Sequence, residues 1–279
     1  MLNKEVQAKL IKTGRDFTKG YILNDPYEEK FESDQELRLP QPPLVKAPVT
    51  PEDSWIHLTR DFSETVVKSN ILDLIRDRKS ARIYTGEAMT LEQLSFLLWA
   101  TQGIKSVRGK SYATLRTVPC GGARHEFETY MIVRNVEGLQ AGVYHYLPMH
   151  HALEFIKSLD DINQTISESL CGQSWAAKAN VVFYWSMVAY RAEWRYGIYA
   201  HRVALIDLGH IGQAMYTACT ATGLGCCGIG AFQHEFCADV FDLDGEDEYI
   251  VYTTPVGTIR DKDKEAEQAF YQFVKEQGL

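Results

Sequence analysis

Two arginines and a serine at alternate positions form the first group of residues that could do chemistry. They are Arg78, Ser80 and Arg82. In an extended chain, side chains two positions apart point to the same side. Guanidinium groups bind phosphate oxygens in pairs, and a serine hydroxyl adds a neutral donor, so these residues are a candidate phosphate clamp. The alternative is a solvated basic stretch between two helices.

A glycine-rich segment at 223–228 has the spacing of the dinucleotide-binding motif G-x-G-x-x-G. That motif needs a strand before it and a helix after it. Here the expected order is reversed, because a long helical segment precedes the glycines and an apolar, strand-like run at 226–232 follows them. We therefore interpret the glycines as positions where a flat ring can approach the backbone, with a helix cap and ordinary tight packing as the alternative.

A second segment rich in small residues, at 116–125, precedes an expected strand. Its backbone could come within contact distance of a ligand, although a plain turn is the alternative interpretation. Arg260 follows the expected last strand and could add a positive charge beside an anionic ligand. Taken alone it would be a surface arginine.

We expect no metal site. His234 and Cys237 are three positions apart and could share a helix face, but no second pair at ligand spacing follows. Six cysteines in 279 residues are too sparse for a disulfide framework, which indicates reduced thiols. Cys120, Cys226 and Cys227 could be redox-active, but buried structural thiols are the favoured interpretation.

The composition excludes several classes of partner. The net charge is −8, whereas a protein that wraps a polyphosphate backbone needs an excess of clustered Lys and Arg, so we do not expect nucleic acid as a partner. Residues 1–10 lack the continuous apolar core of an export signal, and no stretch reaches about 18 uninterrupted apolar residues. We expect a cytoplasmic protein that does not enter a membrane.

The chain divides into an N-terminal helix and extended Pro-rich arm, residues 1–65, and one larger domain, residues 66–279. Such an arm must lie across something to stay ordered, and in an oligomer this is often the partner subunit. In the larger domain a helix is expected at 71–75. Another begins after Thr90, whose side chain can form a capping box with Gln93, and ends at Gly103.

The remaining apolar segments predict a meander of strands, a strand covered on both faces, a last strand and a long, mostly apolar helix. Strands and helices do not alternate strictly, so we predict an α+β fold. The expected strands are 127–133, 142–147, 151–156, 181–187 and 249–254, and the long helix is 199–222.

Five motifs, in the right order, together resemble the nitroreductase superfamily. More narrowly, they resemble its branch of azoline-type dehydrogenases from thiazole/oxazole peptide biosynthesis and their stand-alone relatives. The resemblance covers about residues 71–260. The motifs are R-x-S-x-R from Arg78, P-C-G-G-A-R-H from Pro119, L-I-D-L-G-H-I-G-Q from Leu205, G-L-G-C-C-G-I-G-A-F from Gly223 and P-V-G-T-I-R ending at Arg260.

The resemblance implies a sandwich with a mainly antiparallel central sheet, flanking helices and a long buried central helix. It implies a homodimer with two FMN molecules at the interface. Arg78, Ser80 and Arg82 would then hold the FMN phosphate and ribityl chain, with Arg260 assisting. The residues implied around the flavin ring are Pro119, Cys120, Gly121 and Gly122 from the other subunit and Gly228, Ile229 and Gly230 along the isoalloxazine.

Two departures from the family pattern bear on the reaction. Pro119 is followed by Cys120 where many relatives have Ser, and Ala123 and His125 replace the Asn and Gln of classical nitroreductases. Azoline oxidases carry a Lys-Tyr pair before the long helix, and its nearest counterpart here is Arg195-Tyr196. Arginine stays protonated to about pH 12, so it cannot act as a general base near neutrality.

These points favour a reductase in which NADH or NADPH reduces FMN and leaves, and a small organic acceptor such as a nitroaromatic or a quinone then takes the electrons. One alternative is a flavin-dependent dehydrogenase of azoline or peptide substrates. The other is a flavin-binding protein without turnover. The candidate residues on the substrate side are Tyr190, Arg191, Arg195, Tyr196 and His201.

Overall fold

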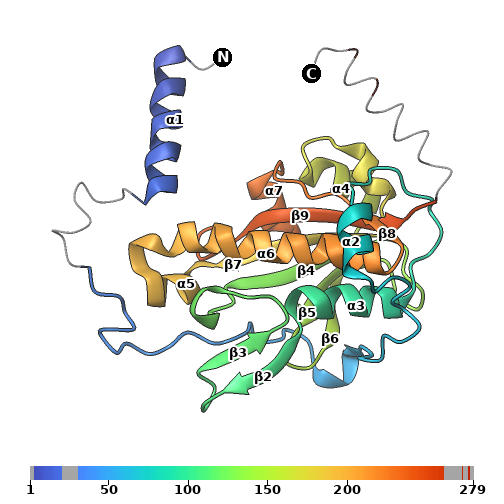
Figure 1. Ribbon diagram of the computed structural model, residues 1–279, viewed down its shortest axis with the longest axis horizontal. Coiled ribbons are helices and arrows are strands. Elements are labelled where there is room, and N and C mark those ends of the chain that lie inside the picture. The colour runs from blue at the N-terminus through green and yellow to red at the C-terminus, as the bar shows by residue number, and fades with distance from the viewer. Residues whose placement is uncertain (1–2, 21–30, 261–271, 273–275, 277–279) are drawn as a thin grey trace.

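A seven-stranded sheet forms the centre of the protein. The computed structural model describes residues 3–20, 31–260, 272 and 276 (Figure 1). Neighbouring strands run antiparallel in the order β1-β6-β5-β4-β7-β9-β8. The strands are β1 (Ile56–His57), β4 (Phe127–Val133), β5 (Gly142–Leu147), β6 (Ala152–Lys157), β7 (Val181–Val188), β8 (Leu224–Cys226) and β9 (Glu248–Thr258).

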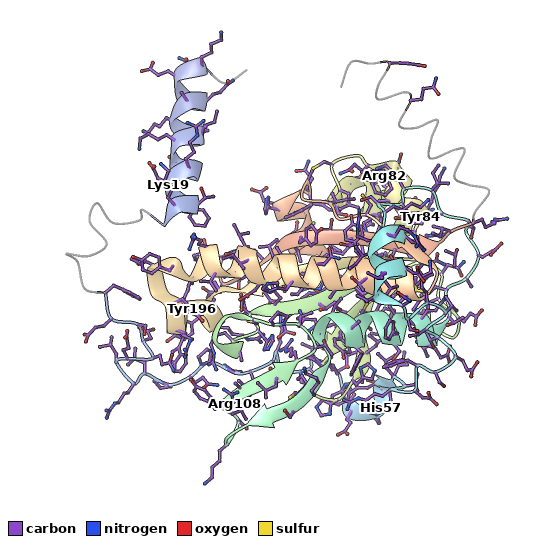
Figure 2. All side chains as sticks on the ribbon, in the orientation of Figure 1. Lys19, His57, Arg82, Tyr84, Arg108 and Tyr196 are labelled. Atoms are coloured by element: carbon purple, nitrogen blue, oxygen red, sulfur yellow. The ribbon has the colours of Figure 1, made fainter. Side chains whose placement is uncertain are left out.

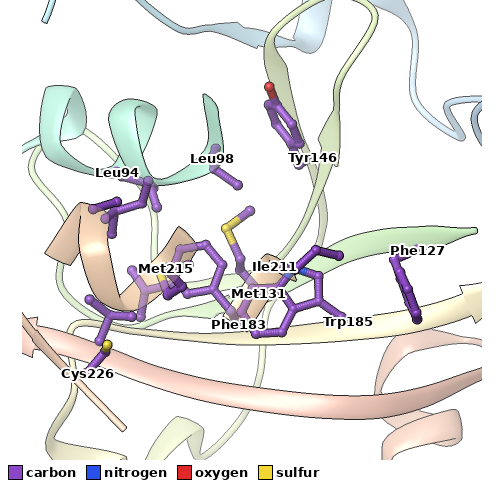
Figure 3. Packing of buried hydrophobic residues seen from close by; sticks show 14 of the residues in the cluster. Leu94, Leu98, Phe127, Met131, Tyr146, Phe183, Trp185, Ile211, Met215 and Cys226 are labelled. Atoms are coloured by element: carbon purple, nitrogen blue, oxygen red, sulfur yellow. The ribbon is translucent and has the colours of Figure 1, made fainter. Parts of the chain in front are cut away.

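Helices cover both faces of this sheet, which confirms the α+β sandwich. One apolar core lies between the sheet and the helices α3 and α6, and Figure 3 shows Leu94 and Leu98 of α3 with Met215 of α6 beside strand residues. A second core lies on the opposite face, under α4 and α7. The helices are α1 (Lys4–Lys19), α2 (Ile71–Asp77), α3 (Leu91–Gln102), α4 (Ile162–Ser169), α5 (Ala189–Tyr196), α6 (Ala200–Ala221) and α7 (His234–Phe241).

The predicted capping box at the start of α3 is confirmed. Thr90 Oγ1 accepts a hydrogen bond from Gln93 N, and Gln93 Oε1 accepts one from Thr90 N, both at 3.1 Å. Gly103 follows the last helical residue, as predicted. The box thus fixes the entry of the helix whose Leu94, Leu97 and Leu98 are fully buried against the sheet.

The long central helix is also confirmed, as α6. It buries Leu208, Ile211 and Met215 against the sheet. A second stripe of the same helix is open in the single chain, where Leu205 and Ile206 are 55% and 53% exposed. Among the described residues no helix is both long enough and apolar enough to cross a membrane.

The apolar run at 226–232 was predicted as strand-like, and this was wrong beyond Cys226. Strand β8 ends there, and Ile229 makes a single bridge to Thr253 of β9. Between these points the ring of Tyr252 lies against Gly228, so the backbone leaves the regular ladder. The expected last strand, in contrast, extends further than predicted in both directions, as β9.

A two-stranded hairpin that the sequence did not predict stands apart from the main sheet. It consists of β2 (Ile104–Arg108) and β3 (Ala113–Arg116). Four of the five residues of β2 are exposed, so the alternation that marks a strand at a core is missing. The short helices α4, α5 and α7 also went unpredicted.

The N-terminal arm packs along its own chain. Strand β1 pairs with β6 at the sheet edge. The backbone amide of Lys46 donates to Glu128 Oε1 at 2.7 Å, and the amides of Val49 and Thr50 donate to Glu154 Oε2 at 2.8 and 3.0 Å. Both carboxylates are 1% exposed, so the arm supplies donors to buried charge. Residues 21–30 of the predicted arm, and most of the chain after Arg260, lie outside the described residues.

Candidate functional site

Three segments far apart in the sequence meet at the hydroxyl of Tyr216 on α6. Ser80 Oγ lies 3.0 Å from Tyr216 Oη, and Gly228 N donates to the same oxygen at 2.9 Å. The Arg78 guanidinium carbon lies 5.3 Å from the centre of the Tyr216 ring. The candidate clamp and the glycine-rich segment therefore face one point of the central helix.

Residues after α2 are extended, as the clamp hypothesis requires. Ser80 forms a parallel bridge to Cys226, and Ala81 N donates to Cys226 O at 2.8 Å. This pairing holds the segment against the end of β8 and alternates its side chains. Arg78 and Ser80 face Tyr216, while Lys79 and Ala81 line a cavity on the other side.

Arg82 lies on the same stretch, with its guanidinium carbon 6.0 Å from the centre of the Trp175 ring. The positive charge of Arg82 also acts on the Cys227 thiol. Burial raises the pKa of the Cys227 thiol, and the positive charge of Arg82 opposes that rise. Arg82 therefore lies close enough to the glycine-rich segment to act on the same ligand as that segment.

Arg260 occupies the cavity on the other side of the clamp. That cavity has a volume of about 570 Å³, and its charged lining residues are Lys68, which pairs with Asp77, and the side chains of Lys79 and Arg260. Arg260 also lies 3.5 Å from Glu87 Oε1. The structure thus places Arg260 with Lys79, across the backbone from the side chains of Arg78 and Ser80.

The two glycines of the segment after Cys227 differ in their surroundings. A Cβ added to Gly228 would lie 1.8 Å from the Tyr252 hydroxyl, whereas one added to Gly230 would meet nothing within 4 Å. Ile229 between them is buried. Gly228 is therefore needed by the protein's own packing, and Gly230 faces open space that a ligand can use.

The loop that begins at Pro119 lies at the other end of α6. Gly121 N donates to Asp207 Oδ2 at 2.8 Å. A Cβ on Gly121 would lie 2.6 Å from Val203, and one on Gly122, whose φ is +55°, would lie 2.3 Å from Arg195 Nε. Both glycines are required where the loop packs on α5 and α6 of its own chain.

Within one chain, the loop and the clamp do not meet. Asp207 and Tyr216 are nine positions apart on α6 (207 to 216), a rise of roughly 14 Å. Figure 2 shows the same separation, with Tyr196 and Arg82 toward opposite ends of this helix. The predicted flavin contacts thus form two half-sites in each chain.

An acidic cluster that the sequence analysis missed lies beneath the loop. Cys120 Sγ is 3.3 Å from Glu126 Oε2, and one ligand-type atom from each of Cys120, Glu126 and Asp207 lies within 4.8 Å of the others. Glu126 and Asp207 are 1% and 4% exposed. The signal in the sequence was a single acid, Asp207, within the apolar stretch from Leu205 to Ile211.

Burial shifts the protonation of all three groups. Burial raises the pKa of Glu126 to about 7 from its usual 4.5, and the charge of Asp207 adds to this. Burial also raises the pKa of Asp207, against the hydrogen bond from Gly121 N. Burial and the two carboxyl groups raise the pKa of the Cys120 thiol well above its usual range.

Two of the residues predicted on the substrate side contact the arm. The Tyr190 hydroxyl donates to Asp34 Oδ2 at 2.8 Å, and Arg195 donates to Gln35 Oε1 at 2.8 Å. Tyr196 lies beside the loop, since a Cβ on Gly122 would be 3.0 Å from its hydroxyl. The arm thus covers the outer side of α5.

Arg191 and His201 are placed differently. Arg191 is 4% exposed, and its guanidinium lies 2.6 Å from Glu128 Oε1, so it neutralises a buried carboxylate inside the protein. His201 is exposed, and its Nε2 lies 3.0 Å from Glu193. His201 also lines an apolar cavity of about 150 Å³ with Phe17 of α1.

His234 and Cys237 share α7 but do not converge. The His234 ring packs on Phe232 at 4.6 Å between ring centres, and the Cys237 thiol faces Ser169 O at 3.8 Å. All six cysteines carry free thiols.

Comparison with known proteins matches this arrangement to one family. The family model described as "Nitroreductase family" matches residues 75–258. A protein assigned as a nitroreductase in Methanocaldococcus jannaschii is 31% identical over 186 residues, which is 66% of this chain and 89% of the relative. The microcin B17-processing protein McbC of Escherichia coli is 27% identical over 195 residues, 68% of this chain and 66% of McbC.

Solved structures share the fold. A protein from Ralstonia eutropha described as a nitroreductase superimposes with a TM-score of 0.61 at 23% identity, covering 80% of this chain and 100% of that one. A chain of the E. coli microcin synthetase McbBCD complex with truncated pro-MccB17 superimposes with a TM-score of 0.55 at 19% identity, covering 93% of this chain and 95% of that one. Both likenesses reach beyond the segment that the family model matches.

Proposed function

The chain belongs to the nitroreductase family, and from that premise we propose that it is an FMN-dependent oxidoreductase that reduces a small organic acceptor with NADH or NADPH. Arg78, Ser80 and Arg82 hold the FMN phosphate and ribityl chain, and Arg260, in the cavity across the backbone, assists only through the longer-range field of its charge. FMN would supply the chemistry of accepting a hydride from one substrate and passing electrons to another. The residues of the chain bind it, orient it and set the charge around it.

The observation that carries this proposal is the meeting of Arg78, Ser80 and Gly228 at Tyr216. A guanidinium and a hydroxyl are donors suited to phosphate, and Gly230 leaves open space beside them. Among the described residues, no carboxylate lies within ion-pair distance of Arg78. Its charge is therefore available to an anionic ligand.

A second copy of the chain would complete the site. Leu205 and Ile206 lie exposed on α6 just before Asp207, and Gly209, between Asp207 and Tyr216, has open space beside it. If two α6 helices cross antiparallel near residues 211 and 212, midway between Asp207 and Tyr216, the Asp207 end of one helix lies over the Tyr216 end of the other. Pro119, Cys120, Gly121 and Gly122 of one subunit then reach the flavin held by its partner.

A second exposed apolar patch lies on α2. Ile71, Leu72 and Ile75 are 60%, 71% and 67% exposed there. The backbone amides of residues 67 and 68, which lead into α2, donate to Ala221 O, so α2 lies beside the end of α6. Exposed apolar patches on neighbouring helices are typical of a protein–protein interface. These patches support the homodimer.

The substrate side is assigned to the groups near the loop. We propose Tyr190, Arg195, Tyr196 and His201 as the residues that border the acceptor, beside the flavin face that the loop covers. The N–H of Gly121 already donates a hydrogen bond to Asp207, so it does not donate to the flavin. The loop would contact the flavin ring by van der Waals packing.

A second candidate function is dehydrogenation of an azoline or peptide substrate. The similarity to McbC, whose name describes processing of microcin B17, favours it. The position of Arg195 counts against it, because a permanently protonated side chain cannot remove a proton from the substrate. A flavin-binding protein without turnover is the third outcome.

The deciding experiment is an absorption spectrum of the purified protein, with chromatography of the released cofactor, followed by anaerobic addition of NADH or NADPH. We expect an FMN spectrum that bleaches within a turnover and recovers when a quinone or nitroaromatic is added. Slow bleaching together with oxygen-dependent oxidation of an azoline peptide would support the dehydrogenase instead. FMN that binds but never turns over would support a binding protein, and a protein that binds no FMN would contradict the proposal.

A further inference from the structure

The acidic cluster beneath the loop places two carboxyl groups in a buried space, where ionising both at once is unfavourable. Glu126 Oε1 is buried and has no hydrogen-bond partner, although Glu126 Oε2 accepts from the Cys120 thiol. Asp207, on the facing helix, has one oxygen occupied by Gly121 N. Two carboxylates brought this close in a low dielectric favour sharing one proton, because their charges repel each other.

Asp207 also lies near a histidine one turn further along α6. Asp207 Oδ1 lies 3.7 Å from His210 Nδ1, and the His210 side chain is 42% exposed. Cys120 is partly exposed, whereas Glu126 and Asp207 are buried. Of these three groups, the thiol is therefore the one that a ligand beside the loop can reach.

Several charged and titratable groups face the cluster. The positive charge of Arg116 acts on Glu126, and both Arg116 and Arg124 lie near the Cys120 thiol. Tyr196 and the Arg195 side chain lie against the glycines of the loop. Among the described residues, no salt bridge involves Glu126. The positive charge of the arginines therefore acts on the acid pair without direct ion pairing to Glu126.

We propose that Glu126 and Asp207 share one proton and that this acid pair, acting through the Cys120 thiol, supplies the proton that the reduced acceptor needs. This inference rests on the proposed function. An acceptor that has received a hydride carries one negative charge and needs one proton. The S–H bond of Cys120 breaks as the new bond to hydrogen forms on the acceptor, and Glu126 gives its proton to the sulfur in the same step, so that no free thiolate forms. A proton from solvent water then restores the acid pair. Cys120 is the catalytic donor, while Glu126 and Asp207 are positioning residues.

The first test needs neither flavin nor turnover. The infrared absorption of protonated carboxyl groups is recorded for the purified protein between pH 5 and 9, with Glu126→Gln, Asp207→Asn and, as a surface control, Asp34→Asn. We expect one protonated carboxyl that titrates near neutrality in the native protein and in Asp34→Asn. It should be lost in Glu126→Gln and shifted in Asp207→Asn. A native protein with no carboxyl titrating above about pH 6 would overturn the shared proton.

The second test follows kcat against pH. Cys120→Ala should lower kcat by about 100-fold or more, the usual contribution of a positioned acid, while Cys120→Ser, which keeps a hydroxyl in the relay, should retain most of it. Glu126→Gln should remove the loss of activity on the alkaline side of neutrality. Cys171→Ala, at an exposed thiol, is the matched control.

The flavin content and the bleaching by NADH or NADPH are measured in the same variants. If wild-type protein binds no FMN, the proposed function fails, whereas the infrared result still decides the shared proton. If FMN binds and bleaches but Cys120→Ala has the kcat of the native protein, the relay is overturned and the proposed function stands.

Discussion

The hydroxyl of Tyr252 occupies the space that a side chain on Gly228 would need, since a Cβ there would lie 1.8 Å from it. Gly228→Ala must therefore push back a tyrosine whose ring is stacked on Trp185. We expect a loss of about 1–3 kcal/mol in the free energy of unfolding, as for other overpacked sites. Thermal unfolding measures it. Gly230→Ala is the control, and an equal loss in both variants would show that packing on Tyr252 is not the reason for Gly228.

Because side chains alternate along the clamp, neighbouring residues should differ in their effect on FMN binding. Arg78→Ala and Arg82→Ala should each weaken FMN binding about 10- to 100-fold, the worth of a lost charge-assisted hydrogen bond of about 1.5–3 kcal/mol. Lys79→Ala, at the position between Arg78 and Ser80, should change it little, because Lys79 lines the opposite cavity. Fluorescence titration of FMN measures all three. A large effect at Lys79 with none at Arg78 would move the phosphate into the cavity with Arg260.

Arg191 can be assigned by separating stability from substrate affinity. Burial raises the pKa of Glu128, but Arg191, His145 and Arg116 together outweigh it and hold that pKa well below its usual range. Arg191→Met leaves this buried carboxylate with only His145 and the Lys46 amide as partners and should cost about 3 kcal/mol of stability, as when one partner of a buried ion pair is removed. Urea unfolding checks this against Arg108→Met at an exposed arginine. Unchanged stability with a raised KM would instead place Arg191 on the substrate side.

The raised pKa of Glu126 gives stability a definite dependence on pH. The folded protein binds this proton more tightly than the unfolded chain, so the stabilisation is complete below pH 4.5 and is lost as the pH rises toward about 7. Relative to Glu126→Gln, the native protein should lose about 3 kcal/mol between these limits. Urea unfolding at several pH values measures the difference. Parallel curves for the two proteins would contradict the shift.

The exposed stripe of α6 should control assembly and cofactor together. Leu205→Glu with Ile206→Glu places charge on a surface that is more than half exposed in the single chain, so folding should survive. We expect sedimentation to show monomers and FMN content to fall in parallel, because each site needs both chains. Met149→Glu, at another exposed apolar residue, should leave both unchanged. Monomers that keep FMN would separate the cofactor site from the interface.

The sequence predicted well those elements of the fold whose signals lie within a few neighbouring residues. The bounds of β4 and β5 match the predicted ranges, since alternation and flanking turns mark them. The capping box at Thr90 was readable because both partners lie within three residues. The hairpin of β2 and β3 escaped prediction because it buries no continuous face.

The site was less predictable because it depends on contacts between distant residues. Ser80 and Gly228 stood out by type and spacing, but Tyr216, which joins them, is one tyrosine on an ordinary helical face. Glu126 and Asp207 are 81 positions apart (126 to 207), and only the fold shows that they share one buried space. The prediction for Gly228 was incomplete for the same reason, because Tyr252, which lies against it, belongs to a strand distant in sequence.

The hydrogen bonds that the arm gives to Glu128 and Glu154 set a limit on where the protein can be divided. The family match begins at residue 75, yet the donors come from residues 46–50. A chain cut back to the matched segment would keep these two buried carboxylates but lose the backbone amides that donate hydrogen bonds to them. Buried charges that lose hydrogen-bond donors destabilise the folded state. The shortest piece of this protein able to fold by itself is therefore longer than the piece it shares with its family.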